Sequence, residues 1–284
     1  MESQGHLFRA MPRARRRTSA FARELAGSAR QAADLASFLT LARDIVGYRA
    51  MRLIDPGRRS PRTVRLAGGA RLTYRLNWGD VRAIAETWFE GAYELPVELR
   101  ARNILDLGAN IGATAVWLAS RYGPARVVAV EAAPANAALA RRNLAANDIE
   151  GEVIEAAVGP EDGTAHFAVS PSSTLGRVSD DGIEVAMVSP GSLVEHFPAG
   201  QTIDIVKMDI EGSENAVLGA PLGWLDHVRC LVVEFHDGRT EAERLAGRLT
   251  EAGFVPRELA ARTGYMGPDD VMLAFTRPET AAVP

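Results

Sequence analysis

The sequence predicts a Rossmann-like α/β fold, with a mostly parallel sheet and helices on both of its faces. From residue 103 onward, short apolar segments alternate with segments of helical periodicity. A glycine-rich turn from Gly108 to Gly112 follows the first apolar segment. The segments that end at Leu107, Val130, Met208 and Phe235 lead into a carboxylate or a glycine cluster, at the sheet edge where open α/β sheets bind ligands.

Composition narrows the class of protein. Of the 284 residues, 47% are hydrophobic and 24% charged, as in ordinary globular proteins, and the net charge of -4 does not favour a nucleic-acid partner. The single cysteine, Cys230, can form neither an internal disulfide nor a zinc cluster, which favours a reducing compartment. No apolar run approaches the roughly eighteen residues of a membrane span. We therefore expect a cytoplasmic protein without a membrane span.

The N-terminal region precedes the alternating pattern. Residues 1–18 form a basic stretch that predicts a disordered tail, with a nucleic-acid or lipid contact as the alternative. Residues 20–53 carry apolar side chains at helical spacing and predict one helix that ends before the turn at 55–57. The apolar stripe of this helix must be buried against another surface, and we expect the helix to form part of a substrate pocket and a homodimer contact. The stripe contains Leu35, Phe38, Leu39, Ala42, Ile45, Val46 and Leu53.

A hairpin and a short helix complete the N-terminal subdomain, which we place at residues 19–98. Residues 63–66 and 71–76 flank Gly68-Gly69 and predict a β-hairpin. Residues 80–90 predict a helix with Asp80 as its N-cap.

The alternating pattern marks the main domain, at residues 99–278, and residues 279–284 are expected to be a second disordered tail. Strands are predicted at 103–107, 126–130, 152–157, 203–208, 230–235, 254–260 and 271–276, and helices at 113–121, 134–147, 214–218 and 240–252. The last two strands have no helix between them, so we expect them to pair antiparallel.

The first loop, Asp106-Leu107-Gly108-Ala109-Asn110-Ile111-Gly112, favours S-adenosylmethionine (SAM) over a dinucleotide. The dinucleotide fingerprint needs glycine where this loop has Asn110 and Ala113. A pyrophosphate requires bare N–H groups at a helix N-terminus, whereas SAM carries an ammonium group that requires hydrogen-bond acceptors. Asp106 and the loop carbonyls can provide them. The alternative is an ordinary glycine-rich turn.

Glu131 ends the second strand about twenty residues after the glycine loop, the spacing at which an acid binds ribose hydroxyls. A carboxylate can accept hydrogen bonds from both hydroxyls. The alternative is an acid that caps the helix beginning at Pro134.

Four motifs together resemble the FkbM family of SAM-dependent methyltransferases. They are the glycine loop, Val130-Glu131, Lys207-Met208-Asp209-Ile210-Glu211-Gly212 and Val233-Glu234-Phe235-His236, and the third is the most distinctive of that family. The resemblance covers about residues 71–277. It implies the class I methyltransferase fold, a seven-stranded sheet with one antiparallel strand, and methylation mostly of hydroxyl groups on natural products, glycans and lipid-linked sugars.

The resemblance also implies which residues contact SAM. They are Asp106, Gly108, Asn110, Gly112 and Glu131. The family usually has a polar residue two places before the position of Ala157, where this chain has Glu155, and we expect Ala157 to line the adenine site through its backbone.

Candidate catalytic side chains follow two neighbouring strands. They are Lys207, Asp209, Glu211, Glu234 and His236. The sulfonium of SAM is already activated, so transfer requires mainly an in-line methyl acceptor, but a hydroxyl must also lose its proton to a base or to a metal-assisted group.

Several roles for these residues stay open at this point. His236 is a candidate base because the unperturbed pKa of histidine is about 6.5. If a metal is present, Asp209, Glu234 and His236 would hold Mg²⁺ or Mn²⁺. Alternatively, Lys207 pairs with Asp209 or Glu211, and Glu211 supports the turn at Gly212 and the first turn of the following helix. Tyr93, shortly before the first strand, is placed to reach the same cleft.

The sequence therefore predicts an O-methyltransferase acting on a hydroxyl of a glycan or specialised metabolite. N- or C-methylation would use the same cofactor site. A SAM-binding protein without catalysis has no need of the acidic cluster, and an NAD-dependent oxidoreductase is disfavoured by the glycine loop.

Overall fold

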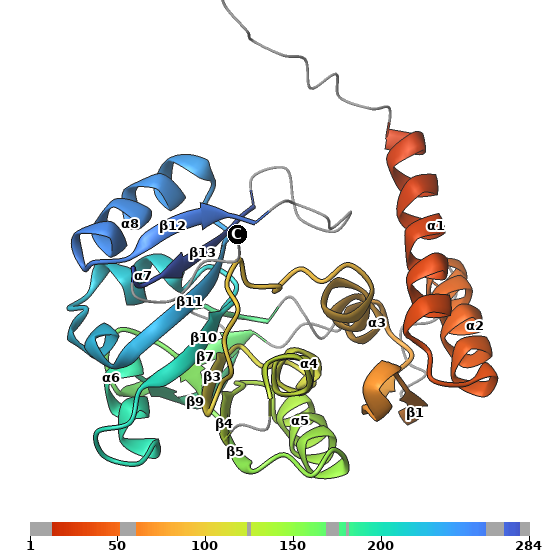
Figure 1. Ribbon diagram of the computed structural model, residues 1–284, viewed down its shortest axis with the longest axis horizontal. Helices are drawn as coiled ribbons and strands as arrows, with labels where there is room; N and C mark the ends of the chain where they lie inside the picture. The colour runs from red at the N-terminus through yellow and green to blue at the C-terminus, as the bar shows by residue number, and fades with distance from the viewer. Residues whose placement is uncertain are drawn as a thin grey trace, which may run out of the picture.

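The computed structural model describes residues 13–51, 61–123, 126–168, 176–179, 182–259 and 270–278. It confirms the Rossmann-like fold: a seven-stranded sheet has the order β12-β13-β11-β10-β3-β4-β5, and β13 alone runs antiparallel to its neighbours β11 and β12 (Figure 1). The strands are β3 (Asn103–Leu107), β4 (Arg126–Val130), β5 (Gly151–Ile154), β10 (Ile203–Met208), β11 (Val228–Phe235), β12 (Val255–Glu258) and β13 (Val271–Thr276).

Helices cover both faces of this sheet, and the strands alternate between two cores. Ile104 packs on one side, with α4 (Ala113–Tyr122) and α5 (Pro134–Ala146), and Cys230 lies in that core. Leu105 packs on the other side, with α7 (Glu214–Gly219) and α8 (Arg239–Glu251). Burial on both faces explains why these strands are continuous apolar runs.

A second sheet was not predicted from the sequence. Its order is β6-β9-β7-β8, and its strands are β6 (Ala157–Val158), β7 (Gly163–Ala168), β8 (Arg177–Val178) and β9 (Ile183–Val188). The single strand expected at 152–157 is therefore wrong, because the chain leaves the central sheet after Ile154 and Ala156 N donates to Glu131 O at 3.2 Å. Most side chains of β7 and β9 are at least partly exposed, so the strands lack a strong apolar pattern.

The expected N-terminal helix is two helices, α1 (Arg13–Gln31) and α2 (Leu35–Met51). Asp34 lies between them and interrupts the helix, because its Oδ1 accepts a hydrogen bond from Ser37 N at 2.7 Å. Helix α1 begins inside the stretch expected to be a disordered tail, of which residues 1–12 lie outside the described residues, as do 279–284 at the other end.

The apolar stripe of α2 is partly exposed. Ile45 is buried, whereas Leu35 is 71%, Leu39 56% and Val46 51% exposed, and Leu53 lies outside the described residues. Beside Ile45, the buried Asp44 accepts a hydrogen bond from Tyr74 OH at 2.8 Å. This side of the helix therefore packs on the hairpin.

The predicted hairpin is confirmed as β1 (Pro61–Arg65) and β2 (Arg71–Arg75). The following helix is α3 (Trp78–Ile84), continued by a π-helical turn, η2 (Ala85–Phe89). Its N-cap is Asn77 rather than Asp80, because Asn77 Oδ1 accepts from Asp80 N at 2.7 Å. Asp80 instead binds Arg75 through two oxygens. Figure 1 shows α3 between the paired helices α1 and α2 and the sheet. The remaining short helices are η1 (Ala67–Gly69), α6 (Pro190–Leu193), η3 (Val194–His196) and η4 (Gly223–His227).

Two asparagines, one on α5 and one at its C-terminal cap, attach the hairpin to the main domain. Asn143 accepts a hydrogen bond from Thr73 N at 2.7 Å and donates to Thr73 O at 2.9 Å and Ile111 O at 2.8 Å. One turn later, Asn147 forms the same pair of bonds with the backbone of Arg71, both at 2.7 Å. The side chains continue the hydrogen bonding of β2 as a neighbouring strand would.

None of the helices within the described ranges is both long and apolar enough to cross a membrane.

We expect Asn143→Ala to lower the free energy of unfolding by about 2–4 kcal/mol, because the buried N–H and C=O groups of Thr73 and the carbonyl of Ile111 lose their partners. Asn147→Ala is the matched control. It deletes the equivalent pair of bonds at a partly exposed position, where water can replace them, and should cost under about 1 kcal/mol. Urea denaturation of both variants measures the difference, and equal losses would show that Asn143 does not hold the hairpin.

Candidate active site

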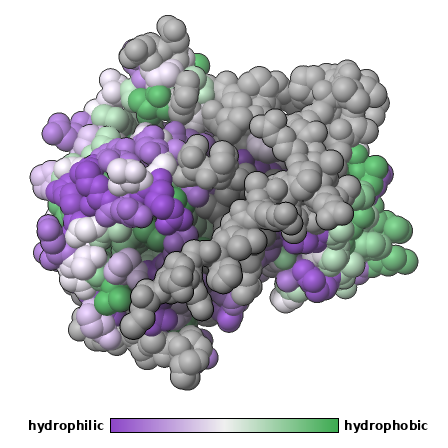
Figure 2. Space-filling view, turned by 90° about the horizontal axis from the view of Figure 1, so that it is seen from above, coloured by the Kyte–Doolittle hydropathy of each residue, from purple (hydrophilic) through white to green (hydrophobic). Residues whose placement is uncertain are grey.

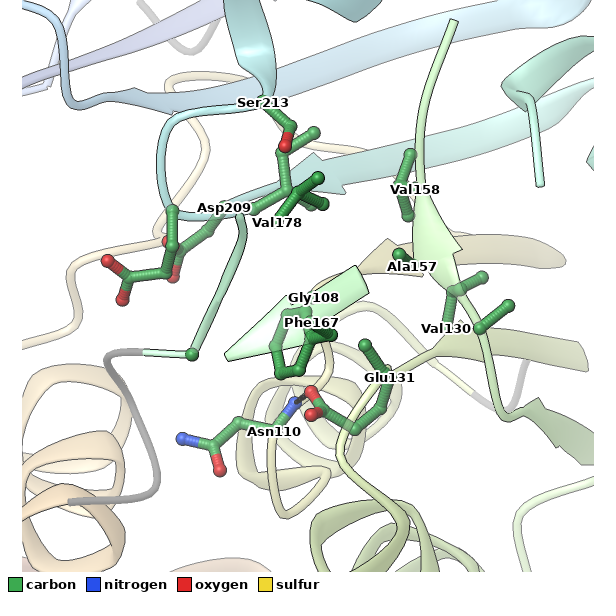
Figure 3. A pocket seen from close by; sticks show the side chains of 15 residues that line it. Gly108, Asn110, Val130, Glu131, Ala157, Val158, Phe167, Val178, Asp209 and Ser213 are labelled. Atoms are coloured by element: carbon green, nitrogen blue, oxygen red, sulfur yellow. Dashed lines mark hydrogen bonds between the residues drawn. The ribbon is translucent and has the colours of Figure 1, made fainter. Parts of the chain in front are cut away.

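Two neighbouring cavities open at the carboxyl ends of the central strands. The apolar cavity is lined by side chains of Val130, Ala156, Ala157, Val158, Phe167 and Val178, with Glu131 among them. The polar cavity is lined by Arg82, Glu86, Tyr93, Thr114, Lys207 and Glu234. Four residues line both cavities: Gly108, Asn110, Asp209 and Glu211. In Figure 3, Asp209 lies at one side of the apolar cavity, and Val130, Ala157 and Val158 lie at the other.

The glycine loop requires glycine for two separate reasons. Gly108 has φ +80°, and a Cβ there would lie 1.8 Å from the backbone oxygen of Asp209. Gly112 has φ +76°, and its Cβ would lie 3.0 Å from Ala140 Cα. The first glycine therefore allows close contact with the loop after β10, and the second allows α4 to begin against α5. Gly112 lies behind the loop and lines neither cavity.

Lys207 and Asp106 form a buried clamp beneath this loop. Lys207 Nζ lies 3.2 Å from Asp106 Oδ1, and it donates to Gly108 O at 2.6 Å and to Leu107 O at 3.3 Å. Burial alone would lower the pKa of Lys207, but Asp106 and Asp209 raise it, so the group stays cationic. The ion pair of Lys207 with Asp209, considered as an alternative, is present at 3.7 Å, but Asp106, which was not expected as a partner, is nearer. Asp106 lines neither cavity, so its side chain supports the loop from below.

Glu131 lies at the rim of the apolar cavity and holds two segments together. Its Oε2 accepts from Asn110 N at 2.8 Å, and its Oε1 accepts from Ala133 N at 2.9 Å, just before α5. Figure 3 shows Glu131 and Asn110 beside each other in the wall of this cavity. The structure thus shows that Glu131 supports the start of α5, which was the alternative role considered for it. It also leaves room on the carboxylate, which has about four lone-pair sites, for bonds from a ligand.

The opposite wall of the apolar cavity comes from the second sheet. Ala157 of β6 is buried and lines this cavity, together with Phe167 of β7 and Val178 of β8. Sequence reasoning missed Phe167 and Val178 because the strands that carry them were not predicted.

Three side chains converge on one point at the ends of β10 and β11. Each of Asp209, Glu234 and His236 offers one ligand atom, and these atoms all lie within 4.8 Å of one another. His236 Nε2 is 3.7 Å from Asp209 Oδ1 and 4.0 Å from Glu234 Oε1. Within the part of the chain that the structure describes, Glu234 Oε1 is buried without a hydrogen-bond partner.

The surroundings of His236 change its charge. Burial alone would lower its pKa, but the hydrogen bond from Nδ1 to Glu214 and the charges of Asp209 and Glu234 raise the pKa to about 10. In this arrangement His236 is a cation at neutral pH. It therefore lacks the free lone pair that the expected general base requires.

The carboxylates of the cluster differ from one another. Burial raises the pKa of Asp209, but Lys207 and His236 outweigh it, so the pKa of Asp209 is lowered. Burial and the charge of Asp209 raise the pKa of Glu211 to about 8, and the same two causes raise the pKa of Glu234 well above its usual value. Negative charge in the cluster is thus concentrated on Asp209.

Two further residues organise the cluster. Tyr93 OH donates to Asp209 Oδ2 at 3.0 Å, which confirms that Tyr93 reaches the cleft. Glu214 was not singled out from the sequence. Its two oxygens accept from Ile210 N and Gly212 N, both at 2.9 Å, and its Oε1 lies 3.1 Å from His236 Nδ1. The support of the turn at Gly212, which we had considered for Glu211, therefore comes from Glu214.

The structure thus brings most of the expected site residues to one cleft. Those that line a cavity are Gly108, Asn110, Glu131, Ala157, Lys207, Asp209, Glu211 and Glu234. His236 lies against the acids of this cleft, and Asp106 and Gly112 support the glycine loop.

Comparison with known proteins identifies relatives. A model of the methyltransferase FkbM domain matches residues 106–258. The curated protein "Methyltransferase sdnD" from Sordaria araneosa is 28% identical over 188 residues, which cover 53% of this chain and 73% of that protein.

Solved structures with a similar fold include two from archaea. A methyltransferase from Pyrococcus furiosus has 13% identity and a TM-score of 0.44, with 82% of this chain and 96% of that one covered. The fibrillarin of Aeropyrum pernix, with natively bound S-adenosyl-L-methionine, has 15% identity and a TM-score of 0.42, with 75% and 93% covered.

Proposed function

The chain belongs to the FkbM family of SAM-dependent methyltransferases, and from this premise we propose that it transfers a methyl group to a hydroxyl of a glycan or specialised metabolite. The observation that carries the proposal is the cluster of Asp209, Glu234 and His236, which lies beside the apolar cavity. A hydroxyl must lose a proton during methylation, whereas a neutral amine attacks through its own lone pair. The acidic cluster therefore favours O-methylation over N-methylation. C-methylation remains the other use of the same cofactor site.

The apolar cavity is the proposed site of the adenosine part of SAM. Small and aromatic side chains such as Ala157 and Phe167 suit a purine ring, and Glu131 suits the two ribose hydroxyls. The sulfonium would then lie near the residues shared by both cavities, above Gly108 and beside Asp209.

Transfer at this point is an in-line displacement. The bond from the hydroxyl oxygen to the methyl carbon forms as the bond from sulfur to that carbon breaks, leaving S-adenosylhomocysteine, and the hydroxyl proton passes to Asp209, the carboxylate on which the negative charge of the cluster is concentrated. Holding the two reactants in line supplies most of the acceleration in such a reaction. Asp209 and Tyr93 are proposed to orient the hydroxyl, because they are already hydrogen-bonded to each other at the shared wall.

A divalent cation fits the same cluster. Oxygen ligands with a single imidazole suit Mg²⁺ or Mn²⁺, and Glu234 Oε1 is a buried oxygen without a hydrogen-bond partner among the described residues. Glu214 on His236 Nδ1 matches the usual support of a metal-binding histidine, whose second nitrogen is held by a carboxylate. We propose Asp209, Glu234 and His236 as its ligands. When bound, the cation would lower the pKa of a coordinated hydroxyl.

A homodimer through α2 is proposed from its exposed apolar face. Leu35, Leu39 and Val46 recur at helical spacing, and each of them is more than half exposed. Figure 2 shows apolar surface gathered at the end of the molecule formed by the N-terminal helices. No described residue of α1 or α2 lines either cavity, whereas α3 and η2 contribute Arg82 and Glu86 to the polar cavity. We therefore propose that α3 and η2 take the pocket role expected of the N-terminal helix. The cytoplasmic location and the lack of a nucleic-acid partner stay predictions.

We expect Glu131→Ala to weaken binding of S-adenosylhomocysteine roughly tenfold to several hundredfold, because one or two charged hydrogen bonds to ribose are lost. Calorimetric titration measures this. Glu155→Ala is the control, since Glu155 follows a neighbouring strand but pairs with the exposed Arg141. Unchanged affinity in Glu131→Ala would remove this residue from the ribose site.

A titration with Mn²⁺, followed by electron paramagnetic resonance, tests the metal without any methyl acceptor. We expect the wild type to bind the ion and His236→Ala to weaken binding roughly tenfold or more. His196→Ala is a matched control, because His196 Nδ1 lies 3.1 Å from Glu152, the distance found between His236 and Glu214. If the wild type does not bind Mn²⁺, the cluster is not a metal site, and its side chains act only through hydrogen bonds and proton transfer.

Light scattering tests the dimer. The wild type should have twice the mass of a single chain, and Leu39→Glu should reduce it to that of one chain by placing a charge in the contact. Val255→Glu, on the exposed edge strand β12, should change nothing. A wild type of single-chain mass would rule the dimer out.

A further inference from the structure

We propose that Arg82 and Glu86 bind the amino-acid end of SAM, with Arg82 on its carboxylate and Glu86, together with Asn110, on its ammonium group. Both charged residues belong to α3 and η2, outside the residues matched by the FkbM domain. The inference rests on the proposed function, because it assigns a second part of the same cofactor.

The two cavities are arranged for one elongated ligand. They share Gly108, Asn110, Asp209 and Glu211, so a molecule can extend from the apolar cavity across the glycine loop into the polar one. SAM has this division of character: an adenosine at one end, and a carboxylate and an ammonium at the other. The polar cavity offers charged groups of both signs, whereas the apolar cavity carries the ring-binding surface.

The pair of Arg82 and Glu86 is held rigidly and is nearly buried. Arg82 Nε lies 2.8 Å from Glu86 Oε1, and the two side chains are 13% and 11% exposed. The guanidinium also lies over the Trp78 ring, 5.1 Å from its centre. A buried ion pair often contributes little to stability, since desolvation of the two charges offsets their attraction. A zwitterionic ligand completes such a pair, and a planar guanidinium matches a carboxylate.

An unsatisfied acceptor lies where the ammonium would be. Among the described residues, Asn110 Oδ1 is buried without a hydrogen-bond partner, and Asn110 lines both cavities. Lys207 also lines the polar cavity, but its ammonium group is already bonded to the loop carbonyls and to Asp106. Among the described residues that line this cavity, Arg82 is therefore the basic group placed to bind the ligand's carboxylate.

Side-chain contacts fix the π-helical turn to the glycine loop side of the domain. Thr87 Oγ1 lies 3.2 Å from Thr114 Oγ1, and Trp88 Nε1 donates to Ala113 O at 3.3 Å. Both partners are in the first turn of α4, directly after the glycine loop. Single π-helical turns occur often at functional sites, and this one places Glu86 in the cavity wall.

The test compares two ligands that share the nucleoside. S-adenosylhomocysteine has the amino-acid end, and 5′-methylthioadenosine lacks it. By calorimetry, Arg82→Met should weaken binding of S-adenosylhomocysteine roughly tenfold to a hundredfold, while affinity for 5′-methylthioadenosine stays within about threefold. Glu86→Gln should show the same selectivity. Arg82→Lys keeps the charge without the planar fork and should give an intermediate loss.

Arg121→Met is the matched control, because it removes an arginine from a 3.0 Å pair with Glu94 outside the polar cavity. It should leave both affinities unchanged. Equal loss of both ligands in Arg82→Met and Glu86→Gln would overturn the proposal, because it would indicate distortion of the glycine loop. Unchanged binding of S-adenosylhomocysteine in these variants would overturn it too and assign the pair to the methyl acceptor. A wild type that binds neither ligand would contradict the proposed function itself.

Discussion

The ion pair between Lys207 and Asp106 is the constraint on which the site depends. The two residues are register partners on the adjacent central strands β10 and β3, and both are almost completely buried. Removal of one member of such a pair typically costs about 3–5 kcal/mol, because the other charge is left buried and unpaired. Here the pair also fixes a loop, since the same ammonium group holds the carbonyls of Leu107 and Gly108. The position of that loop decides where both cavities lie.

The close approach of the two strand-end loops has an electrostatic consequence. Gly108 contacts the backbone of Asp209 so closely that only glycine fits, and Asp209 therefore lies beside the glycine loop, where the two cavities meet. The next strand adds Glu234 and His236 to the same small volume. Acids crowded in this way need compensating positive charge, which Lys207 and His236 supply in part. The raised pKa values of Glu211 and Glu234 reduce the remaining negative charge.

The sequence predicted best where a local pattern reports a local structure. The glycine loop, the strand ends and the antiparallel last strands were all expected, because apolar runs and turn residues mark them directly. Phe167 was missed, since the half-exposed strands of the second sheet have no strong apolar period. The single N-terminal helix was wrong because Asp34 accepts a hydrogen bond from Ser37 N and starts a second helix there. Arg82, Glu86 and Glu214 were not predicted, because their importance arises from contacts between distant segments.

A crystal structure of the chain with S-adenosylhomocysteine tests the central claim most directly. The account predicts that the ribose hydroxyls lie within hydrogen-bond distance of Glu131, that the adenine contacts Ala157 and Phe167, and that the sulfur lies beside Asp209. It also predicts the amino-acid end next to Arg82. A ligand seated elsewhere on the sheet, or one whose sulfur points away from Asp209, would contradict the account.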